Sequence, residues 1–112
     1  MSMAERKPMT FDRDGYPTTA SLRRIRRWEY DTATLADFIC MIHEVWRNGF
    51  ILKSRGLTLV TGGWSGDEDV IHALSDNMLF WRLHCVAWRS GGRYDFRLSQ
   101  GVVNKVRERI KA

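Results

Sequence analysis

The sequence has few cysteines and no long apolar segment. Its two cysteines, Cys40 and Cys85, both lie among apolar residues, so we expect reduced, buried thiols, with a disulfide between them as the less favoured alternative. The longest apolar runs, such as residues 78–81, are far shorter than the roughly 20 residues that cross a bilayer. Residues 1–9 contain no apolar core, so we expect no secretory signal, no membrane contact and a cytoplasmic location.

Histidine is also scarce, and its placement argues against a metal site. Cys40 and His43 could share one helix face, but His84 and Cys85 are neighbours on a predicted strand and would point to opposite sides. A four-ligand zinc site needs a second well-spaced pair. The sequence therefore predicts that no metal is bound, and we expect no other cofactor.

No arrangement of catalytic residues stands out. His72 follows Glu68 and Asp69 by about one helical turn, which is typical of a solvated helix surface. A nucleophile paired with a base, or two carboxylates in apolar surroundings, would be needed for catalysis. The sequence shows neither, so we expect a protein that is not an enzyme.

A glycine-rich loop at residues 61–66 precedes a predicted helix, which is a setting that favours anions. However, Asp67, Glu68 and Asp69 occupy the first turn of that helix, and their carboxylates would repel a phosphate. The loop also lacks the Lys-Ser/Thr pair of a phosphate-binding loop. We therefore expect a structural loop that presents Trp64.

The 112 residues have room for one domain, and 44% of them are apolar, which is sufficient for one core. The net charge of +5 is unevenly distributed, because basic ends flank an acidic middle at residues 31–78. A positive charge of this size leaves contact with nucleic acid or with an acidic protein open.

Apolar spacing and turn residues predict the elements. We expect a flexible or loosely docked arm at residues 1–14 and a single α+β domain at residues 15–112. Helices are predicted at residues 19–28, 35–47, 65–77 and 100–111, and strands at 50–53, 57–61, 78–89 and 94–98. The strands pair as two hairpins that merge into one antiparallel sheet, with the helices on one face, in the order α-α-β-β-α-β-β-α.

Local signals refine the element ends. Thr18 or Thr19 is expected to cap the first helix, and 34–37 and 65–68 have the spacing of capping boxes. Asn48 and Gly49 are expected to end the second helix in the left-handed conformation. Because aromatic residues occur on both faces of the strand at 78–89, we expect it to be central and covered on both sides.

Arginine and tryptophan are the main candidates for contact with a partner. Both residue types are enriched at the hot spots of protein interfaces, and they occur in and around the loop at 61–66 and the second hairpin. The expected anchors are Trp64, Trp88, Arg89 and Arg93. Two basic helices offer an alternative surface for nucleic acid. Its residues are Arg23, Arg24, Arg26, Arg27, Lys105 and Arg109. A third reading is that these arginines only keep an aromatic-rich sheet soluble.

Several motifs together resemble a group of small phage- and prophage-encoded proteins that mostly have no assigned function. The most specific motif is Gly-Gly-Trp-Ser-Gly-(Asn/Asp)-Glu, here at residues 62–68, and the likeness spans roughly residues 14–98. The other matching residues are Asp14-Gly15-Tyr16-Pro17-Thr18, Phe80-Trp81 and the stretch from Arg89 to Phe96. The basic segment at 100–111 lies outside the shared pattern.

Small phage accessory proteins often bind and block host machinery, and anti-CRISPR inhibitors are one such class. The resemblance thus implies a non-enzymatic protein that binds a host or phage protein inside the bacterial cell. Inhibition of a bacterial defence complex is one form of this activity. A nucleic-acid-binding module that uses the basic helices is the alternative. The sequence identifies neither the partner nor the oligomeric state.

Overall fold

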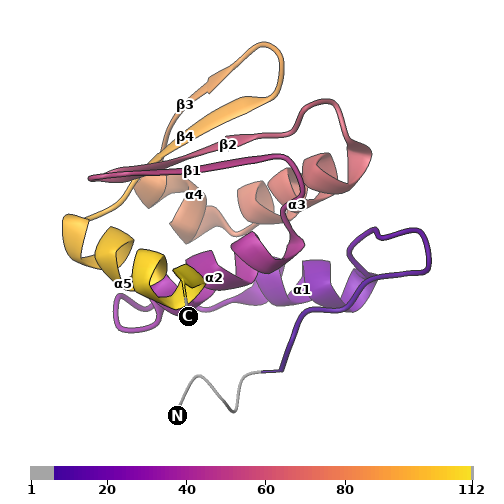
Figure 1. Ribbon diagram of the computed structural model, residues 1–112, viewed down its shortest axis with the longest axis horizontal. Coiled ribbons are helices and arrows are strands. Elements are labelled where there is room, and N and C mark those ends of the chain that lie inside the picture. Colours follow the sequence, from indigo (N-terminus) through magenta and orange to yellow (C-terminus); the bar gives the residue numbers. More distant parts are fainter. Residues whose placement is uncertain (1–6, 112) are drawn as a thin grey trace.

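Four strands form one antiparallel sheet in the order β1-β2-β4-β3 in the computed structural model, which describes residues 7–111 (Figure 1). The strands are β1 Gly49–Lys53, β2 Gly56–Val60, β3 Cys85–Arg89 and β4 Arg93–Arg97. The two predicted hairpins are confirmed, and they join where β2 pairs with β4, for example Leu57 opposite Phe96.

Five helices lie on one side of this sheet, with α1 packed on α3 and α2 (Figure 1). They are α1 Thr19–Arg27, α2 Leu35–Val45, α3 Ser65–Asp76, α4 Met78–His84 and α5 Gln100–Lys111. The predicted α+β class, the four-stranded antiparallel sheet and the order of elements are confirmed. The structure adds one short helix, α4, directly before β3.

The core lies between the sheet and the helices. Leu57 and Leu59 of β2 and Phe96 of β4 are buried on the helix side, because alternate residues of a strand point to the same face. Phe80 of α4 connects this layer to α2, with ring centroids 5.7 Å from Phe96 and 5.1 Å from Phe38. Aromatic packing therefore joins the sheet to the helical layer.

The prediction of one long central strand at residues 78–89 is wrong. The first half is α4, and β3 is an edge strand rather than a central one. Phe80 is buried, whereas Met78, Leu79 and Leu83 are exposed. Because apolar residues lie on all sides of α4, the segment lacks the helical periodicity that would have identified it.

Asn77 positions α4 through contacts that the sequence does not reveal. Its backbone nitrogen donates to the carbonyl of Ala73 in α3, and its backbone carbonyl accepts from Trp81 in α4. Its buried side-chain amide donates to the carbonyls of Ile25 and Trp28, each 2.9 Å away. One residue therefore ends α3, begins α4 and satisfies the carbonyls at the end of α1.

The predicted helix caps have mixed outcomes. Thr18 caps α1, because its side-chain oxygen accepts from the nitrogen of Ser21. The capping boxes are wrong: Thr34 precedes α2 and Ser65 begins α3 without a side-chain cap. The left-handed end at Asn48 and Gly49 is also wrong, since neither residue has a positive φ and Gly49 begins β1.

The carboxylate of Asp67 holds the end of α2 against the start of α3. Asp67 is 0% exposed. It accepts from the backbone nitrogens of Arg47 and Asn48 at 2.9 and 3.0 Å, and from the Asn48 side-chain amide at 2.9 Å. The same amide donates to the carbonyl of Thr61, just after β2. The buried carboxylate is therefore satisfied by three donors from the segment that follows α2. Through Asn48 these contacts also connect α2 and α3 to the end of β2.

The predicted flexible arm at residues 1–14 lies partly outside the described residues, which begin at residue 7. The described part is docked. Met9 is buried, its nitrogen donates to Glu44 Oε2, and the nitrogen of Thr10 donates to Ser21 Oγ. A short bridge between Phe11 and Pro17 closes the following turn.

Replacing Asp67 should destabilise the fold strongly. The variant Asp67→Ala leaves three donors without their acceptor, so we expect the free energy of unfolding to fall by about 3 kcal/mol. Urea denaturation measures this value. Asp69→Ala is the matched control, because Asp69 is exposed in the same turn of α3. Equal losses in the two variants would contradict the role given to Asp67.

Candidate functional site

The sheet face opposite the helices carries a cluster of cations. Strand alternation places Arg93, Asp95 and Arg97 of β4 on this open face, since Phe96 between them points into the core. A shallow hollow of about 420 Å³ lies here. Five cations line it and define what we call the basic sheet face: Lys53, Arg55, Arg89, Arg93 and Arg97.

Among the described residues, Asp95 is the one acidic residue that lines this hollow. Thr58 Oγ1 donates to Asp95 Oδ1 at 2.6 Å, and Arg93 Nε donates to the same oxygen at 3.4 Å. Arg89 Nε lies 3.7 Å from Asp95 Oδ2. The hydrogen bond from Thr58, followed by the nearby positive charges of Arg93 and Lys53, lowers the pKa of Asp95. Five cations against one carboxylate leave an excess of four positive charges.

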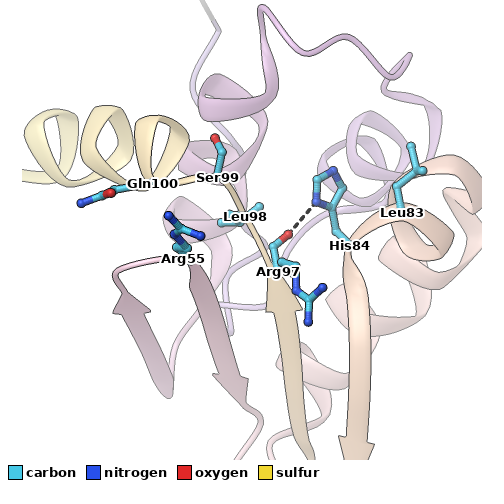
Figure 2. Close-up of a pocket in the computed structure, with 7 residues that line it drawn as sticks. All are labelled: Arg55, Leu83, His84, Arg97, Leu98, Ser99 and Gln100. Carbon is cyan, nitrogen blue, oxygen red and sulfur yellow. Dashed lines mark hydrogen bonds between the residues drawn. The ribbon is translucent and has the colours of Figure 1, made fainter.

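A second and larger cavity, of about 700 Å³, continues the basic surface at the end of the sheet. Arg55 and Arg97 line both hollows. Figure 2 shows this cavity between the turn after β1, the end of β4 and the start of α5, with Ser99 and Gln100 on its α5 side. The positive charge therefore extends from the open face around the end of the sheet.

His84 lines this cavity, yet both of its ring nitrogens are engaged inside the fold. Nδ1 lies 2.7 Å from the carbonyl oxygen of Arg97 (Figure 2), and Nε2 lies 2.6 Å from the Tyr30 hydroxyl. A carbonyl only accepts, so Nδ1 must donate, and a neutral ring then accepts at Nε2 from Tyr30. Burial raises the pKa of Tyr30, which keeps that hydroxyl protonated. The arrangement supports a structural role for His84.

Three of the four expected partner anchors lie together in the β3–β4 hairpin. Trp88 is 70% exposed, and Arg89 and Arg93 are paired across the strands. The turn between them needs Gly91 and Gly92, whose φ values are +89° and +82°. The carbonyl of Gly92 also accepts from the nitrogen of Thr61, which fixes the turn against the end of β2.

Trp64, the fourth expected anchor, is engaged within the molecule. Its ring centroid lies 5.1 Å from that of Tyr16, and the Arg47 guanidinium carbon lies 4.8 Å above the ring. The ring also covers Gly66, where any side chain would collide with it. Trp64 therefore packs the loop after β2 against the turn at residues 14–17, and it does not join the hairpin anchors.

The six expected nucleic-acid contacts are divided between two helices. They lie on α1 and α5, and α2 lies between these two helices and contacts both (Figure 1). Arg24 donates to the carbonyl of Pro8, Arg26 pairs with Asp76 and Arg109 pairs with Asp37. The other three are exposed: Arg23, Arg27 and Lys105.

A third hollow, of about 250 Å³, lies on the helix side of the sheet beside β3. We call it the aromatic groove, defined by Ile71, Trp81, Trp88 and Tyr94. Trp81 and Tyr94 lie edge to face with centroids 6.1 Å apart. His72 also lines the groove, whereas Glu68 and Asp69, its expected helix-surface neighbours, are exposed.

Within residues 7–111, no group of three or more His, Cys, Asp or Glu side chains is placed to hold a metal ion. In the same part of the chain, no helix combines the length and apolarity needed to cross a bilayer.

Sequence reasoning missed part of the basic sheet face. Lys53, Arg55, Thr58 and Asp95 were not expected as site residues. A signal was present in β4, where Arg93, Asp95 and Arg97 alternate with apolar residues. The contact between Thr58 and Asp95 depends on the pairing of β2 with β4, for which the sequence holds no local signal.

Comparisons with known proteins find no matching family model, no matching curated protein and no matching solved structure. The resemblance to small phage-encoded proteins therefore stays a prediction.

Removing the Thr58 hydroxyl should raise the pKa of Asp95, because it deletes the main interaction that stabilises the carboxylate. Carbon-detected NMR titration of Asp95 in the wild type and in Thr58→Val measures this shift. A lowered pKa stabilises the fold above the unfolded value of about 4. That stabilisation disappears as pH falls through the folded value, so the stability gap between the two proteins should be larger at pH 7 than at pH 2. An unchanged Asp95 titration would contradict this assignment.

Proposed function

We propose that this protein is a non-catalytic binding protein whose basic sheet face contacts an acidic surface of a partner protein. The observation that carries the proposal is the concentration of charge. An excess of four positive charges lies on one sheet face that the helices leave uncovered, while the whole chain has a net charge of +5. Such a field attracts and orients an acidic partner.

A protein partner fits this surface better than nucleic acid. The hairpin aromatics Trp88 and Tyr94 share a face with the buried Phe96, on the helix side, so they do not offer the open face a platform for stacking bases. Arg89 and Arg93 on the open face and the exposed Trp88 on the other face of the same hairpin are of the residue types that dominate protein-interface hot spots.

The partner class follows from the resemblance to phage accessory proteins. We propose a host or phage protein in the bacterial cytoplasm, and inhibition of a bacterial defence complex would be one consequence of binding. The engaged nitrogens of His84 support a binding role over a catalytic one. Nucleic-acid binding through α1 and α5 is less well supported, because Arg24, Arg26 and Arg109 are already engaged within the molecule.

Charge reversal on the basic sheet face tests the proposal. The double variant Arg89→Glu/Arg93→Glu should weaken binding of fluorescent poly-L-glutamate at least about tenfold, or about 1.4 kcal/mol, in fluorescence anisotropy. Arg23→Glu/Arg27→Glu is the matched control, because it removes the same charge from exposed positions on α1. We expect this control to bind the probe within about twofold of wild type after correction for the net charge.

Two results would overturn the proposal. One is an equal loss in the α1 control, which would show that only net charge matters. The other is tighter binding of a 20-base-pair DNA duplex than of poly-L-glutamate at the same ionic strength, with the α1 variant losing that binding. This second result would favour the nucleic-acid alternative.

A further inference from the structure

Strand β3 has an unpaired edge. It is the last strand of the sheet, and it pairs with β4 alone. Figure 1 shows β3 at the outer margin of the sheet, with α4, which directly precedes it in the chain, in contact with it on the helix side. An unpaired edge leaves backbone N–H and C=O groups ready to pair with another strand. A register shift between Cys85 and Ala87 disturbs the start of β3, whereas residues 87–89 pair regularly with β4.

The two faces of β3 differ sharply in chemistry. Trp88 points to the helix side and borders the aromatic groove, where Ile71 and Trp81 provide further apolar surface. Arg89 points to the open side and belongs to the basic sheet face. A strand that paired with β3 would place alternate side chains on these two faces, because strand side chains alternate with a period of two.

We propose that β3 accepts an extended acidic segment of the partner as a fifth strand of the sheet. This inference rests on the proposed function and specifies how the acidic partner is recognised. Directly opposed residues in a sheet share a face. The partner residue opposite Trp88 would therefore be apolar and would reach the aromatic groove. Its two neighbours would lie on the open face and would be acidic, with one of them meeting Arg89.

Charge complementarity favours this occupant over a second copy of the chain. Pairing β3 with β3 of another copy would bring together two edges that each carry Arg89, in chains that each have a net charge of +5. An acidic segment instead neutralises the guanidinium of Arg89, which is 67% exposed and lies 3.7 Å from Asp95, further than the 3.4 Å between Arg93 and Asp95. Main-chain pairing would supply affinity and the alternating side chains would supply specificity.

Two capped heptapeptides of identical composition test the alternation. One alternates Glu with Leu, and the other carries the same residues in two blocks. We expect the alternating peptide to bind at least about tenfold more tightly in fluorescence anisotropy, because only its spacing places both residue types on their matching faces. Equal affinities would contradict the inference.

Backbone methylation tests the strand pairing itself. In a strand, successive N–H groups point to opposite edges, so methylating every second amide blocks one edge. Two such forms of the alternating peptide are made, and each blocks a different edge. One form should lose at least about tenfold in affinity, since it cannot donate to β3, and the other should bind nearly as well as the parent. If both forms bind like the parent, no strand is added to β3.

Trp88→Ala provides the protein-side test. The side chain is largely exposed, so the variant should fold, and it should lose about tenfold in affinity for the alternating peptide but not for the block peptide. Phe11→Ala is the control, because Phe11 is an exposed aromatic residue in the turn before α1, outside the four-stranded sheet.

The results separate the two proposals. If both peptides bind equally, and the Arg89→Glu/Arg93→Glu variant still loses poly-L-glutamate binding, the edge-strand inference fails while the acidic partner stands. If neither peptides nor poly-L-glutamate bind, both proposals fail.

Discussion

Side-chain alternation along four strands determines the rest of this structure. Leu57, Leu59 and Phe96 all point to one face of the sheet, so that face must be covered, and the helices lie on that side. The alternate residues, such as Thr58, Asp95 and Arg97, lie on the open face, where Asp95 and Arg97 belong to the charged cluster. The core and the basic sheet face are thus two consequences of the same strand pairing.

Elements with a clear period could be predicted from the sequence. Helices α1, α2, α3 and α5 and three of the strands begin and end near their predicted residues, because each has one apolar stripe or alternates regularly. Helix α4 was missed because its exposed residues, including Met78 and Leu83, are as apolar as Phe80. The helix ends were mispredicted where distant residues replace local caps. Asp67 and Asn77 provide these contacts, and their partners lie up to 52 positions away.

The candidate site was predictable only in part. Trp88, Arg89 and Arg93 occur close together in the sequence, and a hairpin keeps them together. Trp64 also lies in a glycine-rich loop, as the other anchors lie near glycines, but its ring packs against Tyr16 and Arg47 within the molecule. Lys53 and Arg55 come from the other hairpin and reach the site only through the pairing of β2 with β4. That pairing is a long-range contact, which local pattern does not encode.

We propose that partners contact the open face of the sheet and its β3 edge rather than the helical layer. Backbone amide NMR spectra recorded during titration with poly-L-glutamate would locate the contact residue by residue. We expect the chemical-shift changes to concentrate in residues 53–58 and 85–97, with little change in α1 and α5. Changes centred on α1 or α5, with the sheet residues unaffected, would contradict it.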